Sequence, residues 1–174
     1  MNINTSQLKI EQGHLSDLKE LFQIYKNGKI ALEKQNIFQW TDNYPTLSIL
    51  KKDLEKKHLF ILKINNEIIG AINISEEQEK EYKNIDWKFS NKKVLVIHRL
   101  VIDPKKQRNG FANKAMAFAE EYAVSNQYTS IRLDVYSKNN YTVNFYKKRN
   151  FIIRGSVNFP ERKHPFYCME KDLL

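Results

Sequence analysis

The segment Gln107-Arg108-Asn109-Gly110-Phe111-Ala112 has the residue types needed to bind a phosphate group. It follows an apolar stretch typical of a strand and precedes a stretch with helical spacing, so we expect it at a helix N-terminus. Backbone N–H groups there lack partners within the helix, and the helix dipole adds partial positive charge. Gly110 and Ala112 are small enough to let an anion reach the backbone, and Arg108 adds a charge.

The hexapeptide alone also fits an ordinary strand-to-helix turn. The preceding run, Val94–Ile102, is apolar apart from His98 and Arg99, which is typical of a central strand buried on both faces. Because the hexapeptide follows such a strand, we favour the phosphate-binding interpretation over an ordinary turn. The sequence contains neither G-x-x-x-x-G-K-[S/T] nor G-x-G-x-x-G, the patterns of two other phosphate loops.

The elements expected around this segment form a mixed α/β order. Predicted strands are Leu8–Glu11, Leu59–Ile64, Ile68–Ile74, Val94–Ile102, Ile131–Tyr136, Phe151–Val157 and Phe166–Lys171. Predicted helices are His14–Gln35, Pro45–Lys57, Asn113–Asn126 and Tyr141–Arg149. The polar stretch Ser75–Lys83 is expected to leave the sheet as a loop or hairpin arm.

The composition predicts one soluble domain, residues 1–174, since no repeat, low-complexity linker or hinge divides the chain. No apolar run is long enough to span a bilayer, and Met1–Lys9 does not resemble a secretory signal, so we expect no membrane association. The single cysteine cannot form an intramolecular disulfide, and no Cys/His spacing indicates a metal site. These features favour a cytoplasmic protein.

The formal net charge of +9 indicates a surface that attracts anions. A phosphorylated cofactor, nucleic acid or a merely Lys-rich surface would each explain it. Lysine pairs occur at 51–52, 56–57 and 92–93, spread over expected helices and turns as on ordinary solvent-exposed faces. This distribution disfavours a nucleic-acid-binding module.

Two motifs resemble those of the GNAT acetyltransferases. Gln107-x-x-Gly110-x-Ala112, after Leu100-Val101-Ile102-Asp103-Pro104, is similar to motif A, (Q/R)-x-x-G-x-(G/A), and the stretch 133–151 is similar to motif B. The resemblance covers residues 94–151 and extends loosely over the chain, with 40–45 and 165–171 resembling a bacterial subgroup. Asn150 replaces a usual glycine, and since asparagine tolerates the left-handed conformation, we expect the turn to be kept.

The resemblance implies a GNAT fold: a central, mixed, mostly antiparallel sheet of six to seven strands, splayed at the middle and flanked by about four helices. It implies acetyl-CoA as co-substrate, bound by residues 94–151, with 1–60 and 152–174 contributing to the acceptor site and no metal. The cofactor-binding residues it implies are Leu100, Val101, Ile102, Gln107, Arg108, Asn109, Gly110, Phe111, Ala112, Asn139 and Tyr146. Asn139 also fits a helix N-cap, and both roles are compatible.

Attack of an amine on a thioester requires a base for the amine proton and an acid for the leaving thiolate. By the resemblance, Tyr146 is the general acid; the alternative is a packed core tyrosine. His98 is the candidate base, because it lies two residues before Leu100 and is expected on the same face as Leu100 and Ile102. A structural histidine is the alternative, and the other candidates are Glu76, Glu77, Asp134, His164 and a water chain.

The expected acceptor site has an aromatic wall. Its predicted substrate-binding residues are Trp40, Tyr44, Glu76, Phe166 and Cys168, with Phe159 nearby; core packing is the alternative for the aromatic residues. Direct attack needs no acyl-enzyme, so the cysteine is expected in the wall. The expected function is acetyl transfer to a primary amine of a small molecule in a ternary complex. Alternatives are a protein N-terminal or lysine acetyltransferase and a non-catalytic CoA-binding module. A homodimer is suggested by analogy alone.

Overall fold

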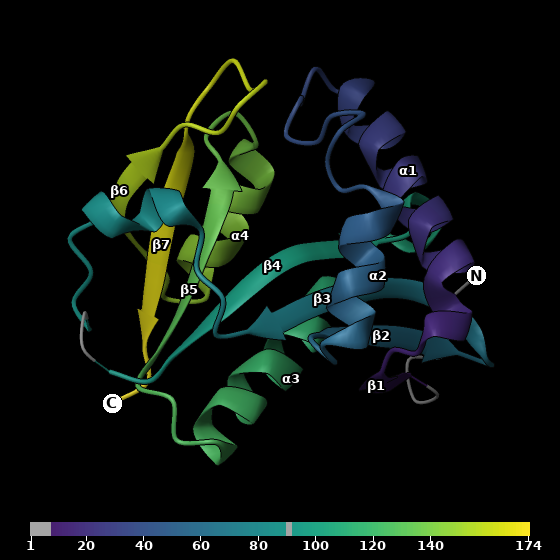
Figure 1. The fold of residues 1–174 in the computed structure, drawn as a ribbon, viewed down its shortest axis with the longest axis horizontal. Helices are drawn as coiled ribbons and strands as arrows, with labels where there is room; N and C mark the ends of the chain where they lie inside the picture. The colour runs from purple at the N-terminus through teal and green to yellow at the C-terminus, as the bar shows by residue number, and fades with distance from the viewer. Residues whose placement is uncertain (1–7, 90–91) are drawn as a thin grey trace.

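The computed structural model describes residues 8–89 and 92–174, which form one seven-stranded sheet in the order β1-β2-β3-β4-β5-β7-β6 (Figure 1). The strands are β1 (Lys9–Gln12), β2 (Leu59–Ile64), β3 (Glu67–Ser75), β4 (Val94–Ile102), β5 (Ser130–Tyr136), β6 (Ile152–Val157) and β7 (Phe166–Asp172). The helices are α1 (Leu18–Glu33), α2 (Leu47–Glu55), α3 (Phe111–Ser125) and α4 (Asn140–Lys148), with 3-10 turns η2 (Leu15–Asp17), η3 (Lys80–Asn84) and η4 (Pro104–Lys106). The predicted strands and helices are confirmed, with shifts at their ends.

The sheet is mixed and mostly antiparallel, as expected. Only β4 and β5 pair in parallel, and they do so from Val94–Ile97 against Ser130–Leu133. Beyond that point the two strands diverge, as Figure 1 shows. Among the described residues, His98–Ile102 therefore has no strand partner on this side. The predicted splay at the middle of the sheet is confirmed.

Helices cover both faces of the sheet. On one face, α1 and α2 bury Leu21, Ile24, Leu50 and Leu54 against β2, β3 and the end of β4. On the other face, α3 and α4 pack onto a core shared by strands on both sides of the splay, with Met116 among its buried residues. α1 and α2 therefore pack on the β2–β4 side of the sheet, whereas the core under α3 and α4 spans the gap between β4 and β5.

The segment after β3 departs from its prediction. Residues 75–83 were expected to leave the sheet, but η3 folds back onto the C-terminal half. Tyr82 and Trp87 bury their rings in a cluster with Tyr136, Phe166 and Cys168. Burial of these two aromatic rings removes a large apolar area from water, which explains why a mostly polar segment returns to the sheet.

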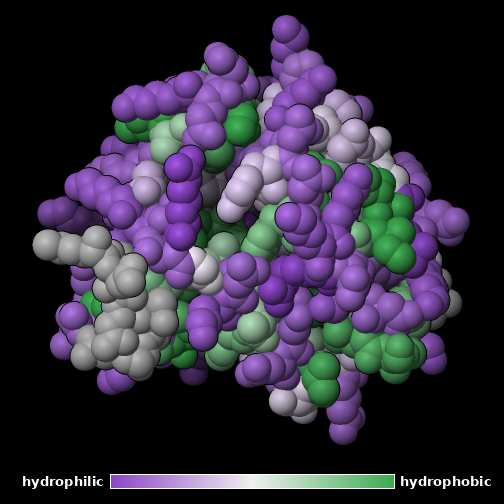
Figure 2. Space-filling view, turned by 180° about the vertical axis from the view of Figure 1, so that it is seen from behind, coloured by the Kyte–Doolittle hydropathy of each residue, from purple (hydrophilic) through white to green (hydrophobic). Residues whose placement is uncertain are grey.

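Hydrophilic side chains cover most of the face seen in Figure 2, with apolar side chains visible in patches between them. Across the described residues, no helix has the length and apolar character needed to cross a membrane.

Candidate active site

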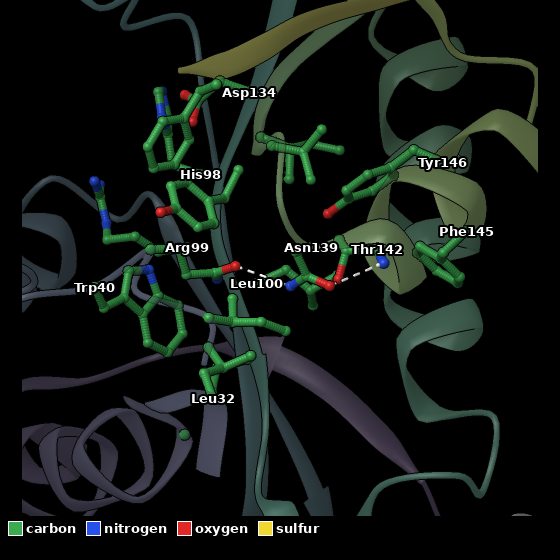
Figure 3. Close-up of a pocket in the computed structure, with 18 of the residues that line it drawn as sticks. Leu32, Trp40, His98, Arg99, Leu100, Asp134, Asn139, Thr142, Phe145 and Tyr146 are labelled. Carbon is green, nitrogen blue, oxygen red and sulfur yellow. Dashed lines mark hydrogen bonds between the residues drawn. The ribbon is translucent and has the colours of Figure 1, made fainter. Parts of the chain in front are cut away.

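The divergence of β4 and β5 opens a cavity of about 990 Å³. Residues that the sequence assigned to the cofactor and to the acceptor meet in its wall. Those present are Trp40, Tyr44, His98, Leu100, Val101, Ile102, Gln107, Arg108, Gly110, Phe111, Ala112, Asn139, Tyr146 and Phe166. The helix N-terminus, the splayed strand and the aromatic residues therefore form one continuous site (Figure 3).

A β-bulge at Arg99 shapes the splayed part of β4. Arg99 has a φ of 51°, and the register against β3 shifts between Ala71 and Asn73. Arg99 contacts Asp53 of α2, whereas Leu100 and Ile102 pack into the core beneath α3. Because a bulge inserts one residue, it interrupts the alternation of faces.

The prediction that His98 shares a face with Leu100 and Ile102 is therefore wrong. Its imidazole points instead to the segment after β3, where Nε2 lies 2.8 Å from the Glu77 carbonyl oxygen. The bulge separates it from the two residues with which simple alternation had grouped it.

Three contacts fix the bulge. The Arg99 guanidinium donates from Nε and Nη2 to the two Asp53 carboxylate oxygens, each at 2.9 Å, and from Nη1 to the Tyr44 hydroxyl at 2.8 Å. The Tyr25 hydroxyl donates to the Arg99 carbonyl oxygen at 2.6 Å. A left-handed non-glycine residue costs conformational energy, and these contacts with buried groups offset it.

The anion-binding segment has the predicted helix N-terminus, and α3 begins at Phe111, two residues earlier than expected. Gly110 is the N-cap with a φ of 79°, and a Cβ there would meet no atom within 4 Å. No described residue accepts a hydrogen bond from the N–H groups of Arg108, Asn109 or Gly110. The mouth of the helix is open to the cavity, and it presents unpaired N–H groups of the kind that bind anions.

Two predicted cofactor residues shape this loop through their side chains. Gln107 Nε2 donates to the Ile102 carbonyl at 3.1 Å, and Asn109 Nδ2 donates to the carbonyls of Lys106 and Gln107, both at 3.0 Å. Asn109 is outside the cavity wall, so its side chain serves the loop itself.

Tyr146 is both packed and directed into the cavity. On α4 its ring lies edge-on to Phe145 and Phe151, with centroids 5.2 and 5.6 Å away. Its hydroxyl points into the cavity on the side of Asn139 (Figure 3). Burial raises the pKa of Tyr146 above its ordinary value, so the phenol keeps its proton.

Asn139 joins the two sides of the cavity. Its Oδ1 accepts from the Thr142 N–H at 3.1 Å, which makes it the N-cap of α4. Its Nδ2 donates to Gln39 Oε1 at 2.9 Å, in the loop between α1 and α2. The N-cap role considered from the sequence is confirmed, and the contact with a cofactor stays a prediction.

Two titratable groups, His98 and Asp134, lie in the cavity wall where β4 and β5 separate. Burial lowers the pKa of His98 to about 4, with a further contribution from Arg99. Asp134 accepts a hydrogen bond from the Tyr82 hydroxyl at 2.7 Å, and burial raises the pKa of Asp134 to about 6. Near neutral pH the imidazole is therefore uncharged, while the carboxylate is ionised and close to its pKa.

The structure places the other candidates named in the sequence analysis away from the cavity wall. Glu76 accepts from the Tyr128 hydroxyl at 2.8 Å, and Glu77 pairs with Lys56. Cys168 is fully buried in the core beneath η3, and burial raises the pKa of its thiol to about 12. His164 lies beside the Tyr136 ring, 6.1 Å between centroids.

The sequence analysis missed several polar residues of the wall, among them Gln39, Glu79, Arg99 and Arg162. Gln39, Glu79 and Arg162 lie outside the helices and strands, where no periodicity assigns a direction to a side chain. Arg99 is in a strand, but its direction follows from the bulge. No motif or periodic pattern in the sequence indicated that these four side chains belong to the wall.

The comparisons with known proteins agree with this arrangement. The sequence matches the family model described as the acetyltransferase (GNAT) family over residues 17–151. A search of curated proteins finds no match.

Solved structures show the same fold. A GNAT-family acetyltransferase of Streptococcus agalactiae is 16% identical with a TM-score of 0.81, covering 96% of each chain. One of Listeria monocytogenes is 16% identical with a TM-score of 0.77, covering 95% of each. The ribosomal-protein-S18-alanine N-acetyltransferase of Escherichia coli is 11% identical with a TM-score of 0.69, covering 95% of this chain and 94% of its own.

Proposed function

Because the chain belongs to the acetyltransferase (GNAT) family, whose members are acyl-CoA-dependent N-acetyltransferases, we propose that it transfers the acetyl group of acetyl-CoA to a primary amine of a small molecule. The observation that carries the proposal is the single cavity that connects the open N-terminus of α3 with Tyr146 and Asp134. The amine attacks the thioester directly, in a ternary complex.

The N-terminus of α3 binds the pyrophosphate through its free N–H groups, with Arg108 adding charge. The splayed edge of β4, at Leu100, Val101 and Ile102, binds the pantetheine arm as a neighbouring strand would. Gly110 keeps the mouth of the helix free of side-chain atoms. These residues orient the thioester toward α4.

Tyr146 and Asp134 divide the proton transfers. Asp134 removes a proton from the acceptor ammonium, directly or through water, and the freed amine forms the C–N bond as the C–S bond breaks. Tyr146 gives its proton to the departing sulfur. We assign the base to Asp134 rather than to His98, because a group with a pKa of about 6 accepts a proton near neutral pH more effectively than one with a pKa of about 4.

Two loops close over the acceptor end and support a small acceptor over a polypeptide. Asn43 Nδ2 donates to Glu161 Oε1 at 3.0 Å, and Arg162 Nε donates to the Gln39 carbonyl at 3.3 Å. A protein substrate, as for the Escherichia coli relative in its name, would have to enter past these contacts. A protein N-terminus remains the second candidate because that relative has the same fold.

The test is acceptor-dependent release of CoA across a panel of amines, amino acids and peptides. We expect turnover with small amines, and we expect Tyr146→Phe to lower it about 100-fold with acetyl-CoA affinity retained. Tyr122→Phe, on α3 outside the cavity wall, is the matched control and should behave as wild type.

Two outcomes would contradict the proposal. A protein that binds acetyl-CoA but releases CoA with no acceptor in the panel is not the proposed enzyme. Full turnover in Tyr146→Phe removes the general-acid role.

A further inference from the structure

The acceptor end of the cavity presents hydrogen-bond acceptors without matching donors. The first is His98, which is 8% exposed. Its Nε2 lies 2.8 Å from the carbonyl oxygen of Glu77, and since a carbonyl can only accept, Nε2 carries the proton. The ring is neutral, so Nδ1 is an unprotonated acceptor.

A second acceptor, a carboxylate, lies near that nitrogen. Glu79 Oε1 lies 3.8 Å from His98 Nδ1, too far for a hydrogen bond. A donor placed between these two acceptors would form a hydrogen bond with each of them. An ammonium group supplies three N–H donors and a positive charge.

Asp134 adds a second carboxylate to the same wall. It accepts one hydrogen bond, from Tyr82, and keeps further acceptor capacity. Glu79 and Asp134 also influence each other, since the Glu79 charge is one cause of the raised pKa of Asp134. Both carboxylates line the same cavity, where a ligand with two cationic ends would find a partner for each.

Two cations of the wall direct their hydrogen bonds to other groups, although their positive charges also lower the pKa of Asp134. Arg99 is paired with Asp53, and Arg162 donates to the carbonyls of Gln39 and Pro160 while its guanidinium lies 5.0 Å from the Tyr44 ring centroid. Lys80, at the rim, has a side chain that is 83% exposed. The last cation, Arg108, belongs to the anion-binding loop. A third acidic residue of the wall, Glu81, lies beside Lys80.

We propose that the acceptor is a small diamine, with Glu79 and His98 Nδ1 binding the ammonium group that does not react and Asp134 facing the one that does. This inference rests on the proposed function and names the substrate class for it. The aromatic side chains of Trp40 and Phe166 contact the carbon chain between the two amines.

The test uses linear amines of three to six carbons in matched sets: the diamine, the monoamine and the ω-amino acid of equal length. These differ only in a positive, neutral or negative far end. We expect the kcat/KM of the best diamine to exceed that of its monoamine by about tenfold or more, with the amino acid lowest. Glu79→Gln, which keeps the shape and removes the charge, should reduce the preference to about twofold or less.

Glu121→Gln is the control, because Glu121 is exposed on α3 and is not part of the cavity wall. It should keep the diamine preference. In parallel, calorimetry measures diamine binding to the CoA-saturated protein, and Glu79→Gln should weaken that binding about tenfold.

The outcomes separate the two proposals. Turnover of monoamines without a diamine preference, or a preference unchanged by Glu79→Gln, overturns this inference and leaves the acetyltransferase standing. Better turnover of amino acids or peptides overturns it too. Absence of CoA release with every amine contradicts the proposed function, and the calorimetric measurement then decides the diamine site independently.

Discussion

At the splay of the sheet, Asp134 and His98 experience the same physical effect with opposite results. Burial disfavours whichever form carries charge, so it raises the pKa of the carboxyl and lowers that of the imidazole. A sequence shows two titratable residues but not their burial. This is why His98, with its suitable unperturbed pKa, was the preferred base at the sequence level and Asp134 a weaker candidate.

The pH dependence of activity distinguishes these two bases. The base must be deprotonated, so kcat/KM should rise with pH through about 6 if Asp134 acts and through about 4 if His98 does. Asp134→Asn should abolish the rise of kcat/KM near pH 6 and lower activity about 100-fold. The measurement is a profile of CoA release from pH 4 to 9 at subsaturating amine. A limb near 4 that persists in Asp134→Asn would return the role to His98.

Residues were predictable where a backbone requirement restricts the amino acid. Gly110 could be assigned because a phosphate-binding turn needs positive φ and no side chain, and Asn150 because it follows a helix; both have positive φ. Glu79 and Arg99 could not be assigned. The directions of these two side chains depend on the segment that follows β3 and on the β-bulge. Neither feature produces a periodic pattern of apolar residues in the sequence.

At the scale of elements, the N-terminus of α3 carries the proposed cofactor binding. Its amides are free because Gly110 caps the helix through its backbone alone, with no side-chain hydrogen bond. A Ser or Asp in that place would bind the N–H groups that an anion needs. The helix is therefore poorly capped. Its stability is lower without a side-chain cap, and the N–H groups that this leaves unpaired are the ones proposed to bind the anion.

Gly110→Asn tests this element without forcing the backbone, because asparagine tolerates positive φ. Its side chain would enter the open mouth of the helix, and we expect acetyl-CoA affinity to fall about tenfold or more while the fold is kept. Lys57→Asn is the matched control, since Lys57 has a φ of 59° and is not in the cavity wall. Calorimetry gives the affinities and circular dichroism the fold. Unchanged affinity in Gly110→Asn would show that phosphate binds elsewhere.

Strands and helices were predicted well because each has an apolar pattern that matches its period. The segment 75–89 was not, since its two buried rings, Tyr82 and Trp87, are too few to form a pattern. Their burial depends on a surface offered by β5 and β7, which follow much later in the chain.

At the scale of the whole molecule, β4 and β5 join two halves of one sheet through a short parallel ladder, Val94–Ile97 against Ser130–Leu133. One half carries the bulge and the free helix N-terminus, and the other carries Tyr146 and Asp134. Neither half contains the complete site. The resemblance predicted the splay that separates these halves, whereas the contacts between the two loops at the acceptor end were not predicted.

A ligand bound between the halves contacts both, so it should stabilise the whole fold rather than one part. At a concentration of about 100 times its Kd, acetyl-CoA should add about 2.7 kcal/mol to the free energy of unfolding. For a chain of this size that corresponds to a rise in Tm of roughly 5–10 °C, measurable by calorimetry. At the same concentration Gly110→Asn, whose Kd is expected to be about tenfold higher, should show a smaller rise. Two separate melting transitions, of which the ligand shifts one, would instead mean that the halves unfold independently and that the cofactor contacts a single half.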